Sequence, residues 1–230
     1  MAGPEFNAST FNGRLRLFPL PNLVLFPNVV QALRIFEPRY VALMEEALAD
    51  DRRFAMALLR PGWEPHYASQ PDIHATVCLG RINTYHRNED GSYNLMLMGE
   101  ARVRILEELD EGLPFRTARG AALRDAYRDP LQQGSAHLRE TLIEVFKQVA
   151  PKKLGVTPAI RKMLREEVTL GALTDIIAYI APLDPADKQR LLDDTLVERR
   201  ASQLIGLLRS QEGPANSDSP QPFPPPFSAN

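Results

Sequence analysis

Residues 15–48 read LRLFPLPNLVLFPNVVQALRIFEPRYVALMEEAL, and this stretch decides the fold. Pro19, Pro21 and Pro27 each remove a backbone donor, so the stretch cannot be one helix or one central strand. An extended segment with this many apolar side chains must bury most of them. The pattern is therefore typical of a segment that wraps the end of a β-barrel or sheet.

The first half of the chain continues this strand pattern around a single helix. The helix begins at Glu37 and Pro38, and its apolar face is formed by Tyr40, Leu43, Met44, Ala47 and Leu48. Strands are predicted over 15–20, 29–36, 54–59, 73–85, 93–99, 101–109 and 115–123, with a bulge or a barrel-corner bend at Gly80 and a tight turn over 88–92. Residues 15–128 are thus predicted to form a mostly antiparallel β unit with one packed helix.

The loop over residues 60–72 is the candidate binding segment. It is longer than most connections inside a compact domain, and it carries Trp63, His66 and Tyr67. One interpretation is that Trp63 caps the core. The other is that these side chains anchor a partner, which makes the three of them the predicted peptide-binding residues.

From Asp129 onward the segments have helical spacing. One predicted helix closes at Pro151, a short one begins at Thr157–Pro158, and another stops before Pro182. The next begins at Asp184–Pro185, and Thr195–Glu198 reads as a capping box that opens the last. Residues 129–210 are predicted to form a helical subdomain, so the predicted fold class is α+β.

The two ends of the chain lack a pattern that would fold. Residues 1–14 are predicted to be flexible, and the proline- and serine-rich residues 211–230 to be disordered. Within this tail, residues 223–227 read FPPPF. They are interpreted either as solvated chain or as a polyproline-type ligand for an aromatic groove.

Composition argues against several classes of protein. The chain has 230 residues, 44% of them hydrophobic and 24% charged, which is ordinary for a globular protein. A net charge of −2 argues against a strongly basic nucleic-acid binder. Cys78 is the single cysteine, and its apolar neighbours predict a packed side chain. Neither a membrane-spanning apolar run nor a secretion signal is present, so a cytoplasmic protein is expected.

Three stretches of the chain resemble the Lon substrate-binding domain, the N-terminal domain of ATP-dependent Lon proteases. They are the opening with Pro19-Leu20 and Phe26-Pro27, the strands over 77–105, and residues 173–208 with Asp184, Lys188, Gln189, Leu191, Leu192, Glu198 and Arg199. The resemblance covers roughly residues 15–209. It implies a PUA-like barrel followed by a helical bundle. It also implies a module that binds unfolded or exposed apolar polypeptide segments, or a protein partner.

Sequence patterns for catalysis are missing from these 230 residues. No G-x-x-x-x-G-K-[ST] motif is present to bind the phosphates of ATP, and nothing matches a serine–lysine protease domain. The four histidines, His66, His74, His86 and His137, lack metal-ligand spacing. Neither enzyme activity, nor a metal, nor a cofactor is therefore expected.

The alternative is an RNA-binding module, because the PUA fold occurs in RNA-binding proteins. A basic stripe on the late strands would then consist of Arg102, Arg104, Arg116, Arg119 and Arg124. Interspersed acidic residues, among them Glu100, Glu107 and Glu108, count against it, and so does the lack of an RNA-binding motif. Polypeptide binding, in a groove between the β unit and the helices, is the preferred prediction.

Overall fold

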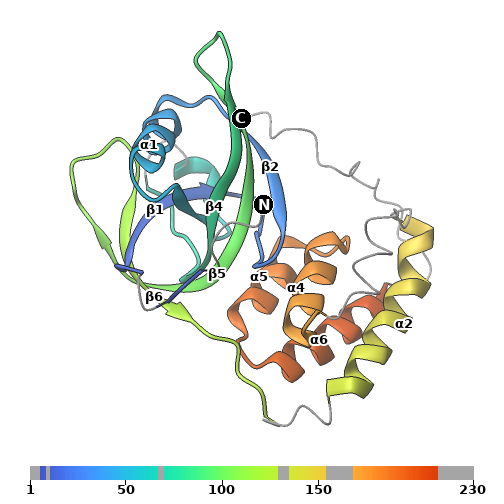
Figure 1. Ribbon diagram of the computed structural model, residues 1–230. Helices are drawn as coiled ribbons and strands as arrows, with labels where there is room; N and C mark the ends of the chain where they lie inside the picture. The colour runs from blue at the N-terminus through green and yellow to red at the C-terminus, as the bar shows by residue number, and fades with distance from the viewer. Residues whose placement is uncertain (1–5, 9–10, 67–69, 129–134, 154–167, 212–230) are drawn as a thin grey trace. The chain divides into compact units, whose positions relative to one another are not determined.

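The computed structural model describes residues 6–8, 11–66, 70–128, 135–153 and 168–211, which divide into two compact units between Arg124 and Asp125 (Figure 1). The first unit carries a six-stranded sheet and one α-helix, and the second carries four described α-helices. The mixed α+β class is as predicted. The helix predicted at Thr157–Pro158 and the tail beyond Gln211 lie outside the described residues.

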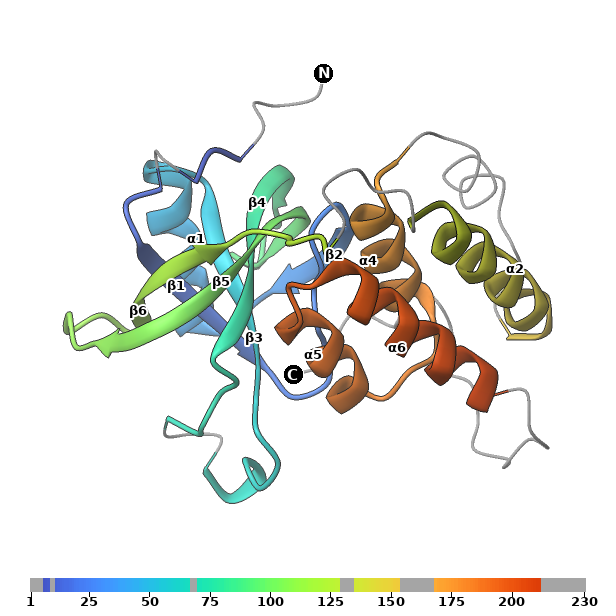
Figure 2. The ribbon, with the colours of Figure 1, turned by 90° about the horizontal axis from the view of Figure 1, so that it is seen from below.

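The six strands of the first unit form one sheet that closes on itself. They are β1 (Arg14–Leu20), β2 (Val30–Ile35), β3 (Arg53–Leu58), β4 (Thr76–Arg87), β5 (Tyr93–Leu109) and β6 (Thr117–Leu123). Their order is β2-β5-β4-β3-β1-β6, and β6 also pairs with β5 (Figure 2). Five strands thus close a barrel, and β2 lies along one end of β5. Among the described strands, only the β1–β3 pairing is parallel.

The length of β5 makes this closure possible. Its first part pairs with β2, where Val30 lies opposite Met98, and its last part pairs with β6, where Leu109 lies opposite Thr117. Two separate strands are predicted here because Gly99 interrupts the apolar pattern. The structure has one continuous strand, since ladder pairing needs only the backbone of a glycine. The irregularity predicted at Gly80 coincides with a register shift between Leu79 and Gly80, where Glu100 is the extra residue on the facing strand β5.

Small and branched side chains fill the barrel, because alternate residues of each strand point inward. The cluster consists of Leu15, Leu17, Ala55, Ala57, Val77, Leu79, Val103 and Ala118. Phe6 and Phe11 pack against it, with ring centroids 5.9 Å apart, although they lie in the segment predicted to be flexible. Cys78 is fully buried, which confirms its predicted packing.

The opening stretch behaves as its prolines predict. β1 pairs with β6 through residues 14–16 and with β3 through residues 17–20, so Pro19 lies where one side of the strand has no described strand partner. Its missing N–H is therefore tolerated. Residues 21–29 then cross the unit without strand pairing and bury Val24, Leu25 and Phe26.

Residues 21–29, which we call the crossing segment, are pressed against the backbone of β5 at Gly99. The amide of Asn28 donates to the carbonyl of Gly99 at 2.9 Å, and the amide of Gly99 donates to the carbonyl of Val29 at 2.8 Å. A Cβ atom at Gly99 would lie 2.0 Å from the carbonyl oxygen of Phe26. Only glycine permits this approach, because a backbone oxygen cannot rotate away as a side chain can.

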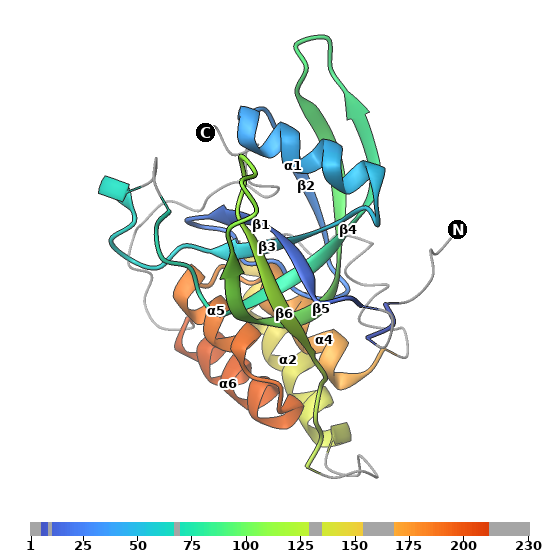
Figure 3. The same ribbon diagram turned by 90° about the vertical axis from the view of Figure 1, so that its left-hand side faces the viewer.

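Helix α1 (Pro38–Ala49) packs against β1, β2 and β3 on the side of the unit seen in Figure 3. It begins at Pro38 as predicted and buries four residues of the predicted face, Tyr40, Leu43, Met44 and Ala47. Its carboxyl end is tied to β1 by Arg16, which is almost fully buried. Arg16 forms ion pairs with Glu46 at 3.2 Å, Asp50 at 2.6 Å and Asp51 at 2.8 Å.

The described helices of the second unit are α2 (Ser135–Lys153), α4 (Leu170–Ile180), α5 (Pro185–Asp193) and α6 (Val197–Ser210). As predicted, α4 ends before Pro182 and α5 begins at Pro185 with Asp184 as its N-cap residue. The Asp184 side chain makes no capping hydrogen bond, however. α4 has a cap that was not predicted, since the hydroxyl of Thr169 accepts from the amide of Ala172 at 3.2 Å.

Two predicted helix ends are wrong. α2 does not close at Pro151 but continues to Lys153. The capping box at Thr195–Glu198 does not form, because the N-cap residue of α6 is Leu196 and makes no side-chain capping bond. The Glu198 carboxylate instead accepts a hydrogen bond from the amide of Arg128 at 3.0 Å.

Residues 125–128, which we call the strap, are attached to the start of α6. The amide of Ala126 donates to the carbonyl of Thr195 at 2.9 Å, and the amide of Val197 donates to the carbonyl of Ala126 at 3.0 Å. This is a short parallel bridge between the strap and Leu196. The first residues of the helical unit are thus held on its last helix.

Arg200 of α6 is completely buried and secures the strap. Its guanidinium donates two hydrogen bonds to the carboxylate of Asp125, at 3.0 and 2.8 Å, and one to the carbonyl of Asp194 at 2.7 Å. Its Nε lies 3.1 Å from Oδ1 of the buried Asp175, in an ion pair whose N–H is not aligned for a hydrogen bond. One buried cation therefore balances two carboxylates.

Lys188 of α5 bonds to the carboxyl end of α4. Its Nζ donates a hydrogen bond to the carbonyl of Tyr179 at 2.7 Å and lies 5.7 Å from the centroid of the Tyr179 ring. Burial disfavours the charged ammonium, so the pKa of Lys188 is lowered to about 8. Burial also raises the pKa of the Tyr179 hydroxyl, to about 12.

The stability of the protein is expected to rise as the pH increases from about 8 to about 10, because of Lys188. In this window the unfolded chain keeps Lys188 protonated while the folded chain releases the proton. The unfolded state then binds more protons, and unfolding becomes less favourable as the pH rises. Lys188→Met should remove this rise and stabilise the protein at pH 7 by up to about 2 kcal/mol.

Urea denaturation at pH 7, 8, 9 and 10, followed by circular dichroism, measures both effects of Lys188→Met. The pH range stops at 10 because ionisation of Tyr179 in the unfolded chain works in the opposite direction above it. An unchanged pH dependence in the variant would show that another group controls the slope.

Candidate functional site

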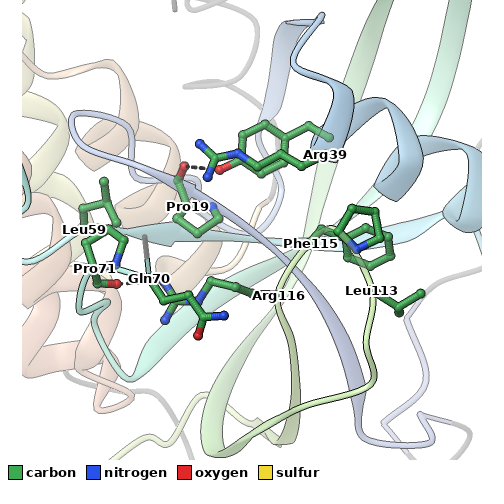
Figure 4. Close-up of a pocket in the computed structure, with 10 residues that line it drawn as sticks. Pro19, Arg39, Leu59, Gln70, Pro71, Leu113, Phe115 and Arg116 are labelled. Carbon is green, nitrogen blue, oxygen red and sulfur yellow. Dashed lines mark hydrogen bonds between the residues drawn. The ribbon is translucent and has the colours of Figure 1, made fainter. Parts of the chain in front are cut away.

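The first unit contains a pocket of about 320 Å³, which we call the proline–aromatic pocket (Figure 4). Four separate segments supply its walls: the end of β1, the first turn of α1, the two ends of the loop after β3, and the connection from β5 to β6. The described lining residues are Pro19, Arg39, Tyr40, Leu59, Gln70, Pro71, Leu113, Pro114, Phe115 and Arg116.

Several of the side chains that line this pocket are apolar. Leu59, Tyr40 and Phe115 are 3%, 5% and 7% exposed, so their side chains are held within the unit. The Tyr40 ring packs on Phe18, with centroids 4.3 Å apart, and its hydroxyl lies 3.5 Å from the carbonyl of Pro19. Leu113 is 38% exposed and forms an apolar part of the rim. The accessible apolar side chain of the pocket is therefore Leu113, and the edges of Tyr40 and Phe115 lie beside it.

The two arginines of the pocket are neutralised by neighbouring carboxylates. Arg116 donates to Glu108 at 2.8 and 2.6 Å, and to the carbonyl of Pro71 at 2.7 Å. Arg39 donates to Glu37 at 3.1 and 2.8 Å, and its guanidinium carbon lies 4.6 Å from the Tyr40 ring centroid. Since these donors are engaged and the charges are paired, the walls suit an apolar group better than an anion.

The loop predicted to bind a partner does contribute to this pocket, through Gln70 and Pro71. Trp63 is half-buried and is not among the described lining residues. His66 ends the short helix η1 (Glu64–His66), but its side chain and all of Tyr67 lie outside the described residues. Binding by these three residues stays a prediction.

The lining residues outside that loop were not singled out from the sequence. The connection from β5 to β6 carried one usable signal, the apolar run Leu113-Pro114-Phe115 at a position where polar turn residues are usual. No such sequence signal marked Arg39 or Tyr40 as lining residues. Tyr40 belongs to an ordinary apolar helix face.

Three of the five arginines of the predicted basic stripe are paired or buried, and Arg104 and Arg124 are exposed. Arg102 is 3% exposed. Arg116 is engaged by Glu108 at 2.6 Å, and Arg119 forms an ion pair with Glu107 at 3.4 Å. Acidic partners on β5 thus neutralise two of the five arginines, and burial removes a third.

A second apolar surface lies on the outer face of the β2–β5 pair. Val30 and Met96 are 37% and 39% exposed, and Met96 lies opposite Ala32 in the ladder. Paired residues of neighbouring strands share one face, so Val30 and Met98 belong to the same surface. This surface is flat sheet, whereas the proline–aromatic pocket is concave.

The described residues also bear on metal binding and on membrane insertion. Among the described residues, no group of three or more histidine, cysteine or acidic side chains is placed to hold a metal ion. Within the same part of the chain, none of the helices has the length and apolar character needed to cross a membrane.

A family model for the substrate-binding domain of the ATP-dependent protease La (Lon) matches residues 14–210. The chain belongs to the Lon substrate-binding domain family. The Lon protease 1 of Bdellovibrio bacteriovorus is 29% identical over 206 residues, which are 87% of this chain and 25% of that protein. The Lon protease of Methylocella silvestris is 26% identical over 196 residues, 84% of this chain and 24% of its own length. This Lon domain thus spans about a quarter of these relatives.

Two solved structures share the fold of this Lon domain. A Lon N-terminal domain protein from Xanthomonas campestris has a TM-score of 0.59 at 22% identity, over 84% of this chain and 97% of its own. The N-terminal domain of a Mycobacterium avium complex Lon protease has a TM-score of 0.64 at 16% identity, over 85% and 98%. The architecture is therefore that of Lon N-terminal domains.

Proposed function

We propose that this Lon domain is a non-catalytic module that recognises exposed apolar segments of polypeptides. The observation that carries the proposal is the proline–aromatic pocket, which brings Leu113, Tyr40 and Phe115 together beside two arginines whose charges are paired. Buried aromatic surface inside a concave site is the usual anchor point for a protein ligand. Membership of a family of substrate-binding domains supports the same function.

We further propose that the first unit is a PUA-like barrel and the second a helical bundle. The closed sheet of the first unit supports a PUA-like barrel, and the mutual packing of α2, α4, α5 and α6 supports a helical bundle. ATP hydrolysis and peptide cleavage would be supplied by other domains or proteins, because these residues carry no motif for either. A cytoplasmic location stays a prediction from the sequence.

Polypeptide is favoured over RNA as the ligand because Arg102 is buried and Arg116 and Arg119 are paired with glutamates, which leaves two of the five arginines of the late strands, Arg104 and Arg124, for such a surface. RNA binding depends on accessible cations and falls steeply with salt. The proline–aromatic pocket instead has Leu113 at its rim and arginines whose charges are paired, which predicts binding that changes little with salt.

Binding of a fluorescently labelled, reduced and carboxymethylated α-lactalbumin, measured by anisotropy, tests the proposal. Saturable binding is expected, and Leu113→Glu should weaken it about tenfold or more, because a charge at the rim must be desolvated. Met96→Glu is the matched control, since it puts the same charge on the outer sheet face, and it should change the affinity less than about twofold.

Three binding results would overturn the proposal, and each leads to a different conclusion. No saturable binding to unfolded polypeptide would remove the function itself. Loss of binding in Met96→Glu alone would move the site to the outer face of β2 and β5. Tight binding of single-stranded RNA that weakens steeply with salt would favour the alternative ligand.

A further inference from the structure

Two walls of the proline–aromatic pocket come from separate connections of the first unit. One wall is the far end of the loop after β3, with Gln70 and Pro71, and the other is the connection from β5 to β6, with Leu113 and Phe115. A ligand gains most from touching both walls if they are already in place, because ordering a mobile wall on binding costs free energy. Binding therefore depends on what holds the loop beside this connection.

The two ends of the loop are attached to each other. Ile73 forms a β-bridge with Leu59, and the amide of Arg60 donates to the carbonyl of Asp72 at 2.8 Å. The Nε of Arg60 also donates to the carbonyl of Ile73, at 3.2 Å. These three contacts close the base of the loop next to β3. They do not involve the connection from β5 to β6, so they do not fix the separation of the two walls.

Arg116 links the loop to the opposite wall. Its Nη1 donates to the carbonyl of Pro71 at 2.7 Å (Figure 4). Its Nε and Nη2 donate to the carboxylate of Glu108 on β5, at 2.8 and 2.6 Å. The Arg116 side chain is only 12% exposed, so little water competes for these bonds. One guanidinium therefore joins β5, the residue before β6, and the far end of the loop.

The position of Arg116 is itself fixed on both sides. The amide of Leu17 in β1 donates to the carbonyl of Arg116 at 2.9 Å. The next residue, Thr117, lies opposite Leu109 in the β5–β6 ladder, and its hydroxyl donates to the carbonyl of Leu109 at 3.2 Å. Glu108 holds one edge of the planar guanidinium by two parallel hydrogen bonds. The remaining nitrogen, Nη1, is thereby directed at the loop.

We propose that Arg116 is the positioning residue of the proline–aromatic pocket, and that it holds the loop wall close enough to Leu113 for one bound segment to touch both. This inference rests on the proposed function, because its consequence is binding at that same site. Arg116 acts through Pro71. Lysine cannot replace it, because a single ammonium group lacks the fork that bonds both carboxylate oxygens and a carbonyl at once.

The test compares the full-length wild type with Arg116→Met and Arg116→Lys. Trp63 is the single tryptophan of the chain and lies in this loop, so its fluorescence reports on the loop wall. Acrylamide should quench Trp63 more strongly in both variants than in the wild type, because the released loop exposes its half-buried ring. The affinity for labelled carboxymethylated α-lactalbumin, measured by anisotropy, should fall about five- to twentyfold.

Arg119→Met is the matched control for the Arg116 variants. Arg119 also belongs to the start of β6 and pairs with a glutamate of β5, Glu107 at 3.4 Å, but its side chain is 63% exposed. Its loss should leave both the quenching of Trp63 and the affinity unchanged. Urea denaturation checks that each variant is folded, and Arg116→Lys serves as the test if Arg116→Met does not fold.

A double variant separates positioning from a general effect on stability. Leu113→Glu should weaken binding less in the Arg116→Met background than in the wild type, since the two changes act on one pocket and are therefore coupled. Additive losses would contradict the role of Arg116 in the pocket.

The outcomes for the inference and for the proposed function are distinguishable. If wild type and Arg116→Met bind α-lactalbumin equally, the inference fails and the proposed function remains. Weaker binding with unchanged quenching of Trp63 also overturns the inference, because Arg116 would then act without the loop. If the wild type does not bind α-lactalbumin, the proposed function fails, and the quenching alone decides whether Arg116 holds the loop.

Discussion

Replacing Arg200 with methionine is expected to destabilise the protein by about 3–5 kcal/mol, because it removes one partner of a buried ion pair. The aliphatic part of the side chain is kept, so the loss reports the charge and its hydrogen bonds. Asp175 would be left as a buried carboxylate without its cation, and the strap would lose both bonds that Arg200 makes to Asp125. Urea denaturation followed by far-ultraviolet circular dichroism measures the change.

Arg190→Met is the matched control for Arg200→Met. Arg190 lies in α5 and its side chain is 74% exposed, where it pairs with Asp187 three residues earlier. Exposed pairs of this kind contribute less than about 1 kcal/mol. Adding Asp175→Asn to Arg200→Met should recover part of the loss, since the uncompensated charge is removed. Similar losses in the Arg190 and Arg200 variants would contradict the role assigned to the buried cation.

Gly99→Ala is expected to destabilise the β unit by about 3 kcal/mol or more, because the added methyl group meets a backbone atom that cannot yield. The new Cβ would lie 2.0 Å from the carbonyl oxygen of Phe26. To relieve this overlap the crossing segment must move away from β5 and break its hydrogen bonds from Asn28 and to Val29. The expected result is a lower denaturation midpoint, measured by urea titration.

Gly206→Ala provides the comparison for Gly99→Ala. Gly206 lies inside α6, and a Cβ there would meet nothing within 4 Å. Alanine is better than glycine in a helix, so this variant should gain up to about 1 kcal/mol. Amide hydrogen exchange at Asn28 and Gly99 adds a local measurement, since both amides should lose protection in Gly99→Ala. Full retention of stability would mean that the crossing segment is not pressed against β5.

Most of the first unit could be predicted because its signals are local. The prolines of residues 19–27 and the spacing of Tyr40, Leu43 and Met44 act within a few residues of themselves. Pairing between distant strands is not local, so neither the parallel β1–β3 contact nor the closure of β5 on β6 could be derived. The failed capping box has the same cause, because Glu198 bonds to Arg128, 70 residues earlier.

The candidate site was only partly accessible from the sequence for a related reason. A pocket lined by four separated segments has no motif of its own, and Tyr40 and Phe115 look like ordinary core residues. The loop over residues 60–72 was predicted from its length and composition, and its far end does line the pocket. Trp63, His66 and Tyr67 of this loop were predicted to bind. The described residues of the loop that line the pocket are Gln70 and Pro71.

The strap also has a consequence for the order in which the chain can fold during synthesis. The barrel has all of its strands once Leu123 has been made, so the first unit can fold while the remainder is still being translated. The helical unit cannot complete its fold during translation in the same way, because Asp125 bonds to Arg200, which is made 75 residues later. Until α6 emerges, Asp175 lacks its ion pair with Arg200, and the strap lacks its bonds to Arg200, Thr195 and Val197. A chain whose synthesis ends before residue 200 would therefore have a complete barrel followed by incompletely packed helices, which chaperones and proteases can recognise.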